Sequence, residues 1–409
     1  MILKNRLAVL RVPNFRRFFA AQSASIVGDE IVVTALAFAV LALSDSPAAL
    51  GLVLAARTVP MIVFMLIGGV LGDLLPRNAV MMTSDLVRFA SQAVMSFLLV
   101  GGVAEIWQLV LLQAVHGLAS AAFAPAIAGM VRDTVEPQRL QEANALLSLL
   151  KSTAKIAGPV LGGLFVLVTG PGWAIAADAV TFLVSALFLW RIRLPAMRSH
   201  FRVENVWSDV AAGWKGFWAV SWVWSIVCVL SVVNMLQAAF NILGPIISHD
   251  ALGGSVAWGI ILSAFGGGSV VGGLVSMVWR PRFPLRTAVL CLVLFPLPVL
   301  ALGAFPSTAV VAASAVVSGI GLMVFNTLWD TSLQTGVDAT MLSRVSSYEW
   351  AGSMGLRSLG LGLVGWLAAS QGAGTVALAS GLGQLLLIGA LFLSAQIRTM
   401  PSTQPVPTK

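Results

Sequence analysis

Long apolar runs separated by short polar connections make up almost the whole chain. Each run continues for ~20 residues without the period-two alternation of a barrel strand, and at ~1.5 Å per residue it is long enough to cross a ~30 Å hydrocarbon core. The pattern therefore predicts an all-α integral membrane protein with about twelve transmembrane helices. We expect these spans at residues 19–42, 49–71, 79–101, 106–128, 143–168, 173–191, 223–247, 255–279, 287–304, 307–330, 345–368 and 375–396.

One connection is much longer than the others. It begins polar and basic and continues with apolar residues at helical spacing, which predicts an amphipathic helix in the cytoplasmic membrane interface. These apolar residues are Val210, Trp214, Phe217 and Trp218. We therefore divide the chain into an N-terminal six-helix bundle (1–192), a cytoplasmic linker (193–222), a C-terminal six-helix bundle (223–397) and a flexible cytoplasmic tail (398–409).

The two halves of the chain repeat one another. The stretch "HGLASAAF" aligns with "SGIGLMVF", so that Gly117 meets Gly319, and the same shift aligns Gly158 with Gly360. A register that holds over two successive spans indicates duplication. Parallel halves related by an axis along the membrane normal are typical of transporters with a substrate site between the halves, so we expect two pseudo-symmetric bundles.

The basic residues are confined to every second connection. The formal net charge is +8 in a chain that is 58% hydrophobic and only 10% charged. Lys and Arg cluster before the first span and in alternate connections after it, whereas the intervening connections, such as "SDSPA" and "TGPGW", contain none. Because positive residues mark the cytoplasmic side, we expect both termini in the cytoplasm. The charge reflects topology and does not indicate a nucleic-acid-binding surface.

No sequence motif of a soluble enzyme occurs. The chain has no phosphate-binding Gly-Lys-Ser/Thr loop, no close Cys pair and no His-Glu-x-x-His, so ATP-driven transport and metal catalysis lack support. Cys228 and Cys291 lie in apolar runs, as expected of small buried hydrophobic residues. We therefore expect no metal site, no cofactor and no enzymatic activity.

Two short motifs resemble signatures of the major facilitator superfamily. Between the second and third spans, "GGVLGDLLPRNAV" is similar to the G-x-x-x-D-R-x-G-R-R motif, with Gly69 and Asp73 in place. Arg77 stands at a later basic position, and Leu74 replaces the usual Arg. In the fifth span, "AGPVLGG" is similar to the core of the superfamily's antiporter motif, which here comprises Gly158, Pro159, Gly162 and Gly163.

The start of the chain and the sixth span carry a closer resemblance. "NFRRFFAAQSASIVGDEIVVTALAF" and "DAVTFLVSALFL" resemble the third drug:proton antiporter subfamily, which includes macrolide and tetracycline efflux pumps and the enterobactin exporter. This resemblance implies proton-coupled export of an organic solute across the cytoplasmic membrane of a bacterium. The chain departs from the superfamily in its fourth span, where Gln113 replaces a motif Arg and His116 follows. A coupling scheme that depends on that Arg is therefore not implied.

Two adjacent carboxylates lie inside the first span. A charge at the centre of a bilayer is costly, by ~3 kcal/mol on insertion scales. At ~100° per residue, Gln22, Ser25 and Asp29 form one polar stripe of this helix, and Glu30 falls on the neighbouring stripe. Because burial and a neighbouring acid favour the protonated form, Asp29 or Glu30 is a candidate proton-coupling group. The alternative is a fixed ion pair that holds helices together.

Cations that could balance these acids lie in other spans. Lys155 and Arg357 lie at the same depth as the two acids, ~20 Å from the outer ends of their helices, and Arg57 lies nearer the outside. Our hypothesis is a midplane network in which protonation of an acid frees a cation to bind a polar or anionic part of the substrate. The alternative is a permanently paired structural network. Further candidates for the cavity wall are Gln113, His116, Asn234, Gln237, Asn241, Asn326 and Asp330.

Charged residues near the cytoplasmic side are candidates for a gate. Asp73 can meet the positive N-terminal end of a helix or an Arg when the cytoplasmic side is closed, and Arg77 can pair with Asp133. We assign Gly69, Asp73, Arg77, Asp133 and Glu349 to this gate.

Charged residues of the third and sixth spans have simpler interpretations. Asp85 and Arg88 are three residues apart on one helix face, which favours a local ion pair. Asp178 shares a face with Thr181 and Ser185, which favours hydrogen bonds between helices.

These observations together predict a monomeric membrane transporter that exports an organic, amphiphilic compound in exchange for protons. Its expected partners are the substrate, protons and the lipid bilayer, and nucleic acid is not among them. Uptake or the flipping of a lipid or lysolipid by the same scaffold is an alternative. A receptor or assembly factor that transports nothing is a further alternative, but it would not need opposed acids and bases at the midplane.

Overall fold

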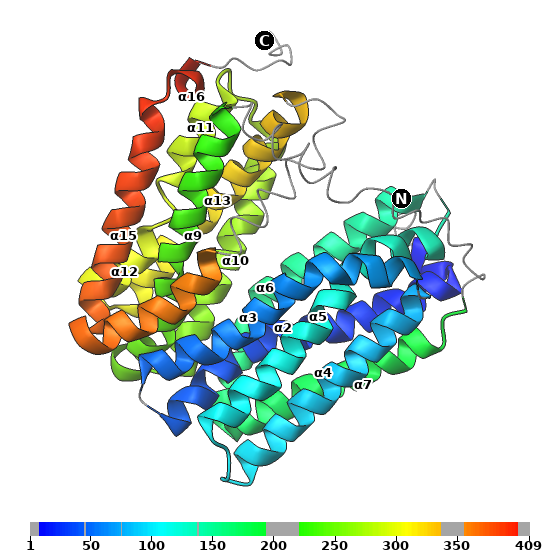
Figure 1. Ribbon diagram of the computed structural model, residues 1–409. Helices are drawn as coiled ribbons and strands as arrows, with labels where there is room; N and C mark the ends of the chain where they lie inside the picture. The colour runs from blue at the N-terminus through cyan, green and yellow to red at the C-terminus, as the bar shows by residue number, and fades with distance from the viewer. Residues whose placement is uncertain are drawn as a thin grey trace. The chain divides into compact units, whose positions relative to one another are not determined.

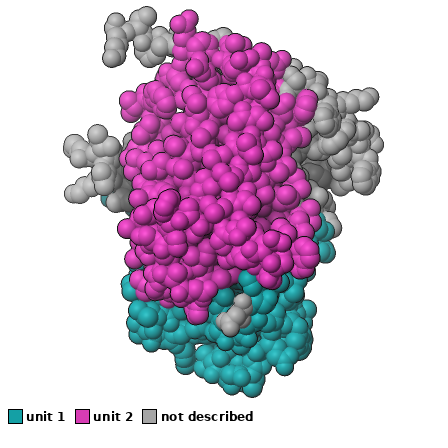
Figure 2. All heavy atoms as spheres, turned by 90° about the vertical axis from the view of Figure 1, so that its left-hand side faces the viewer, with its two compact units in different colours: residues 1–201 teal, residues 202–409 magenta. Residues whose placement is uncertain are grey.

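A computed structural model describes residues 8–44, 46–74, 76–136, 139–193, 221–336 and 356–399, without the side chains of 65–74 and of a few other positions. The chain forms two compact units, residues 1–201 and 202–409 (Figure 2). The amphipathic helix expected at 210–218 lies outside the described residues.

The described part of unit 1 is entirely helical apart from its connections. Its elements are η1 (Ala8–Arg11), α2 (Pro13–Leu43), α3 (Pro47–Leu74), α4 (Arg77–Val100), α5 (Ile106–Thr134), α6 (Leu140–Thr169) and α7 (Pro171–Trp190), as Figure 1 shows. Local residue chemistry sets several of these starts, since Pro at the first helical position is preorganised for a helix. Pro13 opens α2, and Pro171 opens α7 directly after Gly170, whose φ of 86° suits glycine.

Helix α2 lies centrally in unit 1. It contacts α3, α5, α6 and α7, while α3 packs along α5 and α4 packs against both α5 and α7. Near the start of α2, large apolar side chains form a core with α4, α5 and the end of α7, and these include Phe15, Phe18, Met81, Met130 and Leu189. The polar residues Gln22, Ser25, Asp29 and Glu30 of α2 lie beyond this core, towards the middle of the helix.

Unit 2 repeats the helical architecture. Its elements are α9 (Ser221–Ile247), η3 (Ser248–Leu252), α10 (Ser255–Val278), α11 (Pro284–Leu292), α12 (Leu297–Ala304), α13 (Thr308–Gly336), a helix over residues 356–371, α15 (Ala373–Ala390), η4 (Leu391–Leu393) and α16 (Ala395–Thr399). Its core is mostly aliphatic but includes aromatic residues, and the rings of Trp222 and Trp329 meet edge to face with centroids 5.6 Å apart.

Among the described residues, nine helices are long and apolar enough to cross a membrane. The predicted all-α membrane architecture is therefore confirmed at this level. Several boundaries differ from the prediction, among them the ends of α5 at Thr134 and of α13 at Gly336, which were expected at 128 and 330. The first helix begins at Pro13 rather than at residue 19, and residues 248–252, expected to be a loop, form a helical turn that ends at Gly253 with a φ of 97°.

A further difference is a break in the span expected at 287–304. Helix α11 ends at Leu292 and α12 begins only at Leu297. Pro296 precedes α12 and Pro298 lies in its first turn. A proline lacks an N–H group and its ring clashes with the carbonyl four residues earlier, so two prolines here interrupt the hydrogen-bond ladder.

Close glycine contacts occur at matching places in the two units. Gly117 of α5 packs against the backbone carbonyl of Arg57 on α3, and a methyl group at Gly117 would overlap it. In unit 2, Gly319 of α13 packs in the same way against the carbonyl of Phe265 on α10. The sequence repeat aligns these two glycines, so the aligned register corresponds to the same helix-to-helix contact in both units.

A second pair of aligned glycines also makes matching helix-to-helix contacts in the two units. Gly158 of α6 packs against Glu30 of α2, and Gly360 packs against the carbonyl of Met235 on α9. Small residues let helix backbones approach closely in membranes, where interhelical packing supplies much of the association energy.

Candidate functional site

Asp29, near the middle of α2, is held by two arginines from different helices. Arg57 of α3 donates from Nη2 to Oδ1 of Asp29 at 2.8 Å. Nη1 of Arg88 on α4 lies 3.6 Å from the other oxygen, Oδ2. The Asp29 side chain is 30% exposed and that of Arg57 25%, whereas that of Arg88 is only 4% exposed. Asp29 therefore connects a deeply buried cation with a partly accessible one.

Arg88 is shared between two carboxylates. It forms the expected local ion pair with Asp85, which is confirmed, and it also faces Asp29. Its guanidinium lies over the rings of Phe123 and Phe182, 4.0 and 4.5 Å from their centroids. The spacing along α4 predicted the local pair but gave no sign of the contact with Asp29, because that contact depends on how α2 and α4 pack.

A second polar chain runs from α7 to α5. Asp178 of α7 is fully buried, and its Oδ2 accepts a hydrogen bond from Nε2 of Gln92 on α4 at 2.7 Å. Gln92 in turn accepts one from Gln113 of α5 at 3.4 Å. The interhelical hydrogen bond predicted for Asp178 is thus confirmed. Gln113, where the superfamily has Arg, is a neutral member of this chain.

His116 lies near these groups on α5. Its side chain is fully buried and its ring stands edge-on to Phe182, with centroids 5.5 Å apart. Among the described residues, neither ring nitrogen of His116 has a hydrogen-bond partner. On α2, the predicted cavity residues Gln22 and Ser25 are also buried, at 1% and 2% exposure.

Glu30 faces a third direction, towards α6. Its β-carbon lies against Gly158, and the carbonyl of the next residue, Ile31, lies 2.5 Å from where a methyl group on Gly162 would stand. The antiporter-motif glycines therefore form the contact surface between α6 and α2. Lys155, one turn before Gly158 on α6, is exposed.

The predicted gate is described only in part. Arg77, at the start of α4, donates to Asp133 near the end of α5 at 2.9 Å, so the expected pairing is present. Gly69 lies within α3, whereas the side chain of Asp73 and the whole of Glu349 are outside the described set.

The polar residues predicted for the cavity in unit 2 are more scattered. Asn241 donates to the carbonyl of Gln237, one turn earlier on α9, at 3.2 Å, and Asn234 is half-buried. On α13, Asn326 and Asp330 are both exposed. Arg357 is half-buried at the start of the described part of its helix, and the depth it shares with Asp29 stays a prediction.

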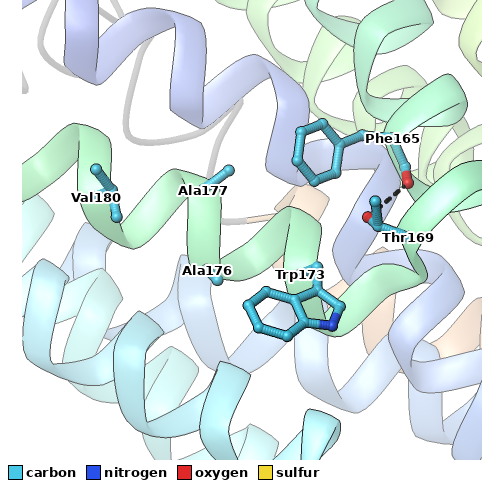
Figure 3. A pocket seen from close by; sticks show the side chains of 6 residues that line it. All are labelled: Phe165, Thr169, Trp173, Ala176, Ala177 and Val180. Atoms are coloured by element: carbon cyan, nitrogen blue, oxygen red, sulfur yellow. Dashed lines mark hydrogen bonds between the residues drawn. The ribbon is translucent and has the colours of Figure 1, made fainter.

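The charged cluster is distinct from an apolar groove on the outside of unit 1. This groove, of about 570 Å³, is lined by Phe165, Thr169, Trp173, Ala176, Ala177 and Val180 from α6 and α7 (Figure 3). The Thr169 hydroxyl donates to the Phe165 carbonyl of its own helix at 2.9 Å, and no titratable side chain lines the groove. No group of three or more His, Cys, Asp and Glu residues suited to a metal occurs in the described residues.

The fold matches that of solved transporter structures. The structure resembles the nucleoside transporter NupG with a TM-score of 0.72 at 14% identity, covering 93% of this chain and 98% of that one. It also resembles a bacterial homologue of the human lysosomal transporter Spinster, with a TM-score of 0.73 at 12% identity and coverage of 94% and 96%. The protein therefore has the fold of the major facilitator transporters.

The sequence identifies the family within that class. A family model described as "Transmembrane secretion effector" matches residues 4–409, and the chain belongs to this family. It is 27% identical over 378 residues to the multidrug efflux pump Tap of Mycobacterium tuberculosis (strain ATCC 25618 / H37Rv), covering 88% of each chain. It is 28% identical over 268 residues to the putative bacilysin exporter BacE of Bacillus subtilis (strain 168), covering 65% of this chain and 66% of BacE.

A further relative is matched over a shorter stretch. The uncharacterized MFS-type transporter YfiS of Bacillus subtilis (strain 168) is 29% identical over 172 residues, which are 42% of this chain and 40% of YfiS. The resemblance to the major facilitator superfamily and its exporters is confirmed. The chain therefore belongs to a family of multi-pass membrane transporters, a class of proteins that are not enzymes.

Proposed function

We propose that the protein is a proton-coupled antiporter that exports an organic, amphiphilic compound across the cytoplasmic membrane of a bacterium. The observation that carries this proposal is Asp29, an acid in the middle of a transmembrane helix that is paired with Arg57 yet keeps 30% of its side chain exposed. An ionisable residue retained within a membrane segment favours a functional role, and partial exposure gives protons a route to it.

The ion pair suggests how proton uptake and substrate binding oppose each other. When Asp29 takes up a proton, its Coulomb attraction to Arg57 is lost. Arg57, whose side chain is 25% exposed, then becomes available to a polar or anionic part of a substrate. When the substrate leaves, Arg57 favours the ionised form of Asp29 again, and the proton is released. Glu30 and the exposed Lys155 are the corresponding acid and base on the α6 side of α2.

The relatives support export rather than uptake. Tap is named as a multidrug efflux pump and BacE as a putative exporter of bacilysin, and both names describe outward transport of organic compounds. We further propose twelve transmembrane helices, cytoplasmic termini, a monomeric state and alternating access powered by the proton gradient alone. The clustering of Lys and Arg in alternate connections supports this topology.

The test measures proton movement that depends on substrate. Everted membrane vesicles from cells that overproduce the protein are acidified inside, and acridine orange reports the pH gradient. Compounds from a panel of amphiphilic antibiotics and cationic dyes are then added. A transported compound should dissipate the gradient with wild-type protein but not with Asp29→Asn.

The matched control is Glu105→Gln. It makes the same carboxyl-to-amide change at an exposed helix cap outside the cluster, where an amide can still accept the hydrogen bond from Trp107. It should behave like wild type. The proposal is wrong if no compound dissipates the gradient, or if Asp29→Asn matches wild type for every active compound.

A further inference from the structure

Asp178 forms no ion pair among the described residues, whereas its neighbours Asp29 and Asp85 each pair with an arginine. The partner of Asp29 is Arg57 and that of Asp85 is Arg88. It lies well inside α7 and is fully buried. A carboxylate buried without a cation is far less stable than the same group in its neutral form.

The hydrogen bonds of Asp178 are also incomplete for an ionised group. Oδ2 accepts from Gln92, whereas among the described residues Oδ1 has no donor at all. Oδ1 lies against α2, 2.5 Å from where a methyl group on Gly28 would stand, so the absence of a side chain at Gly28 leaves room for the carboxyl group. Carboxylates that stay ionised in a buried site accept several hydrogen bonds, and this one accepts a single side-chain bond.

The charges around Asp178 balance only when it is neutral. The charges that act on Asp178 are those of Asp29 on α2, Arg57 on α3 and Arg88 on α4. The other charged or titratable groups of this part of unit 1 are Glu30 on α2, Asp85 on α4, His116 on α5 and Lys155 on α6. In the ion-paired core, two arginines cancel two aspartates, and the buried His116 adds no charge while it is neutral. Glu30 and Lys155 belong to the α6 side of α2 and carry opposite charges. An ionised Asp178 would add one uncompensated negative charge.

We propose that Asp178 is a second proton-binding site of the transport cycle, protonated in the conformation described here and ionised in another. This inference rests on the proposed proton-coupled transport. The proton resides on Oδ1 of Asp178. Its O–H bond breaks during the conformational change, and the proton passes to water through the partly exposed Asp29, the residue next to Gly28.

Arg88 is the cation placed to stabilise the ionised form. Its guanidinium lies over the ring of Phe182, which stands one helical turn after Asp178 on the same face of α7. When Asp178 loses its proton, the new negative charge attracts Arg88 away from Asp29. Because Arg88 now shares its charge between Asp85 and Asp29, this movement weakens the hold on Asp29 and links the two proton sites.

The direct test is infrared spectroscopy of the purified protein in lipid, which needs neither a substrate nor transport. Wild-type protein at neutral pH should show the carbonyl band of a protonated carboxyl group, recognised by its shift in deuterated water. Asp178→Asn should lose this band. Asp133→Asn, which makes the same change at an acid paired with Arg77, should keep it. A missing band in wild type, or a band unchanged in Asp178→Asn, would overturn the proposal.

A second variant keeps the test decisive if Asp178→Asn does not fold. Gln92→Met removes the hydrogen bond to Asp178 but retains the carboxyl group, so the band should move to higher frequency without disappearing. A band that stays in place does not come from Asp178.

Transport measurements then test the role of this proton in the cycle. Asp178→Asn should lose transport driven by the pH gradient while it retains substrate exchange without a gradient. Wild-type activity in both assays would remove Asp178 from the cycle. If wild-type transport ignores the pH gradient, the proposed function fails, whereas the infrared band still shows whether Asp178 holds a proton.

Discussion

The contact between Gly117 and Arg57 predicts that one added methyl group will disturb both stability and coupling. In Gly117→Ala, the new carbon would lie 2.8 Å from the carbonyl carbon of Arg57 and closer still to its oxygen. Ordinary contacts begin near 3.4 Å and the carbonyl oxygen of Arg57 would lie about 1.5 Å closer than that to the new carbon, so α3 and α5 must separate by about 1.5 Å. The atoms met are backbone atoms, which cannot rotate away as a flexible side chain can.

The cost of such overpacking is typically about 1–3 kcal/mol, and a gain of up to about 1 kcal/mol from the better helix propensity of alanine offsets part of it. We expect a net loss of about 1–2 kcal/mol, together with weaker coupling, because Arg57 donates to Asp29 from the displaced helix. The loss of stability is measured by heating the purified protein and monitoring its unfolding by size-exclusion chromatography. The weaker coupling is measured by the acridine orange assay in everted vesicles.

The matched control is Gly267→Ala on α10. Nothing lies within 4 Å of the methyl group that this substitution adds, so stability should stay the same or rise. The reasoning is refuted if Gly117→Ala unfolds at the wild-type temperature, or if Gly267→Ala loses as much stability as Gly117→Ala.

The other charged contacts and the topology give three further predictions. Arg88→Met should destabilise the protein by about 3–5 kcal/mol in thermal unfolding, because it leaves Asp85 buried without its cation, and wild-type stability would contradict the assigned pair. Arg77→Asp should impair transport, and Asp133→Arg in the same chain should restore it by reversing the pair, whereas a double variant no better than the single one argues against this contact. Green fluorescent protein fused after residue 409 should fluoresce, because it folds in the cytoplasm, and a dark but stable fusion would place the C-terminus outside.

The helices of the chain could be predicted from the sequence because membrane spans depend on long apolar runs. The break before Pro296 was missed, since the flanking residues are as apolar as those of an unbroken span and only the local clash of the two prolines interrupts the helix. The turn at 248–252 was missed for the converse reason, because polar residues there read as a loop.

The candidate site was predictable as a set of residues but not as an arrangement. The isolated charges in the apolar runs drew attention to Asp29 and Arg57, and spacing along a single helix identified the pair of Asp85 and Arg88. That Arg88 also reaches Asp29 depends on the packing of α2 against its neighbours, and no local pattern encodes it. The signal in the sequence is the set of polar residues Asp85, Arg88 and Gln92 on α4, which a purely lipid-facing helix would not retain.

Three consecutive residues of α2 contact three different sides of unit 1. Gly28 lies against α7, Asp29 pairs with the arginines of α3 and α4, and Glu30 lies against α6. Successive side chains on a helix point about 100° apart, so a rotation of α2 about its own axis would disturb all three contacts at once. The first helix must therefore tilt or slide together with its neighbours as a rigid group. A proton bound at one of these three contacts then alters the interactions of α2 at the other two.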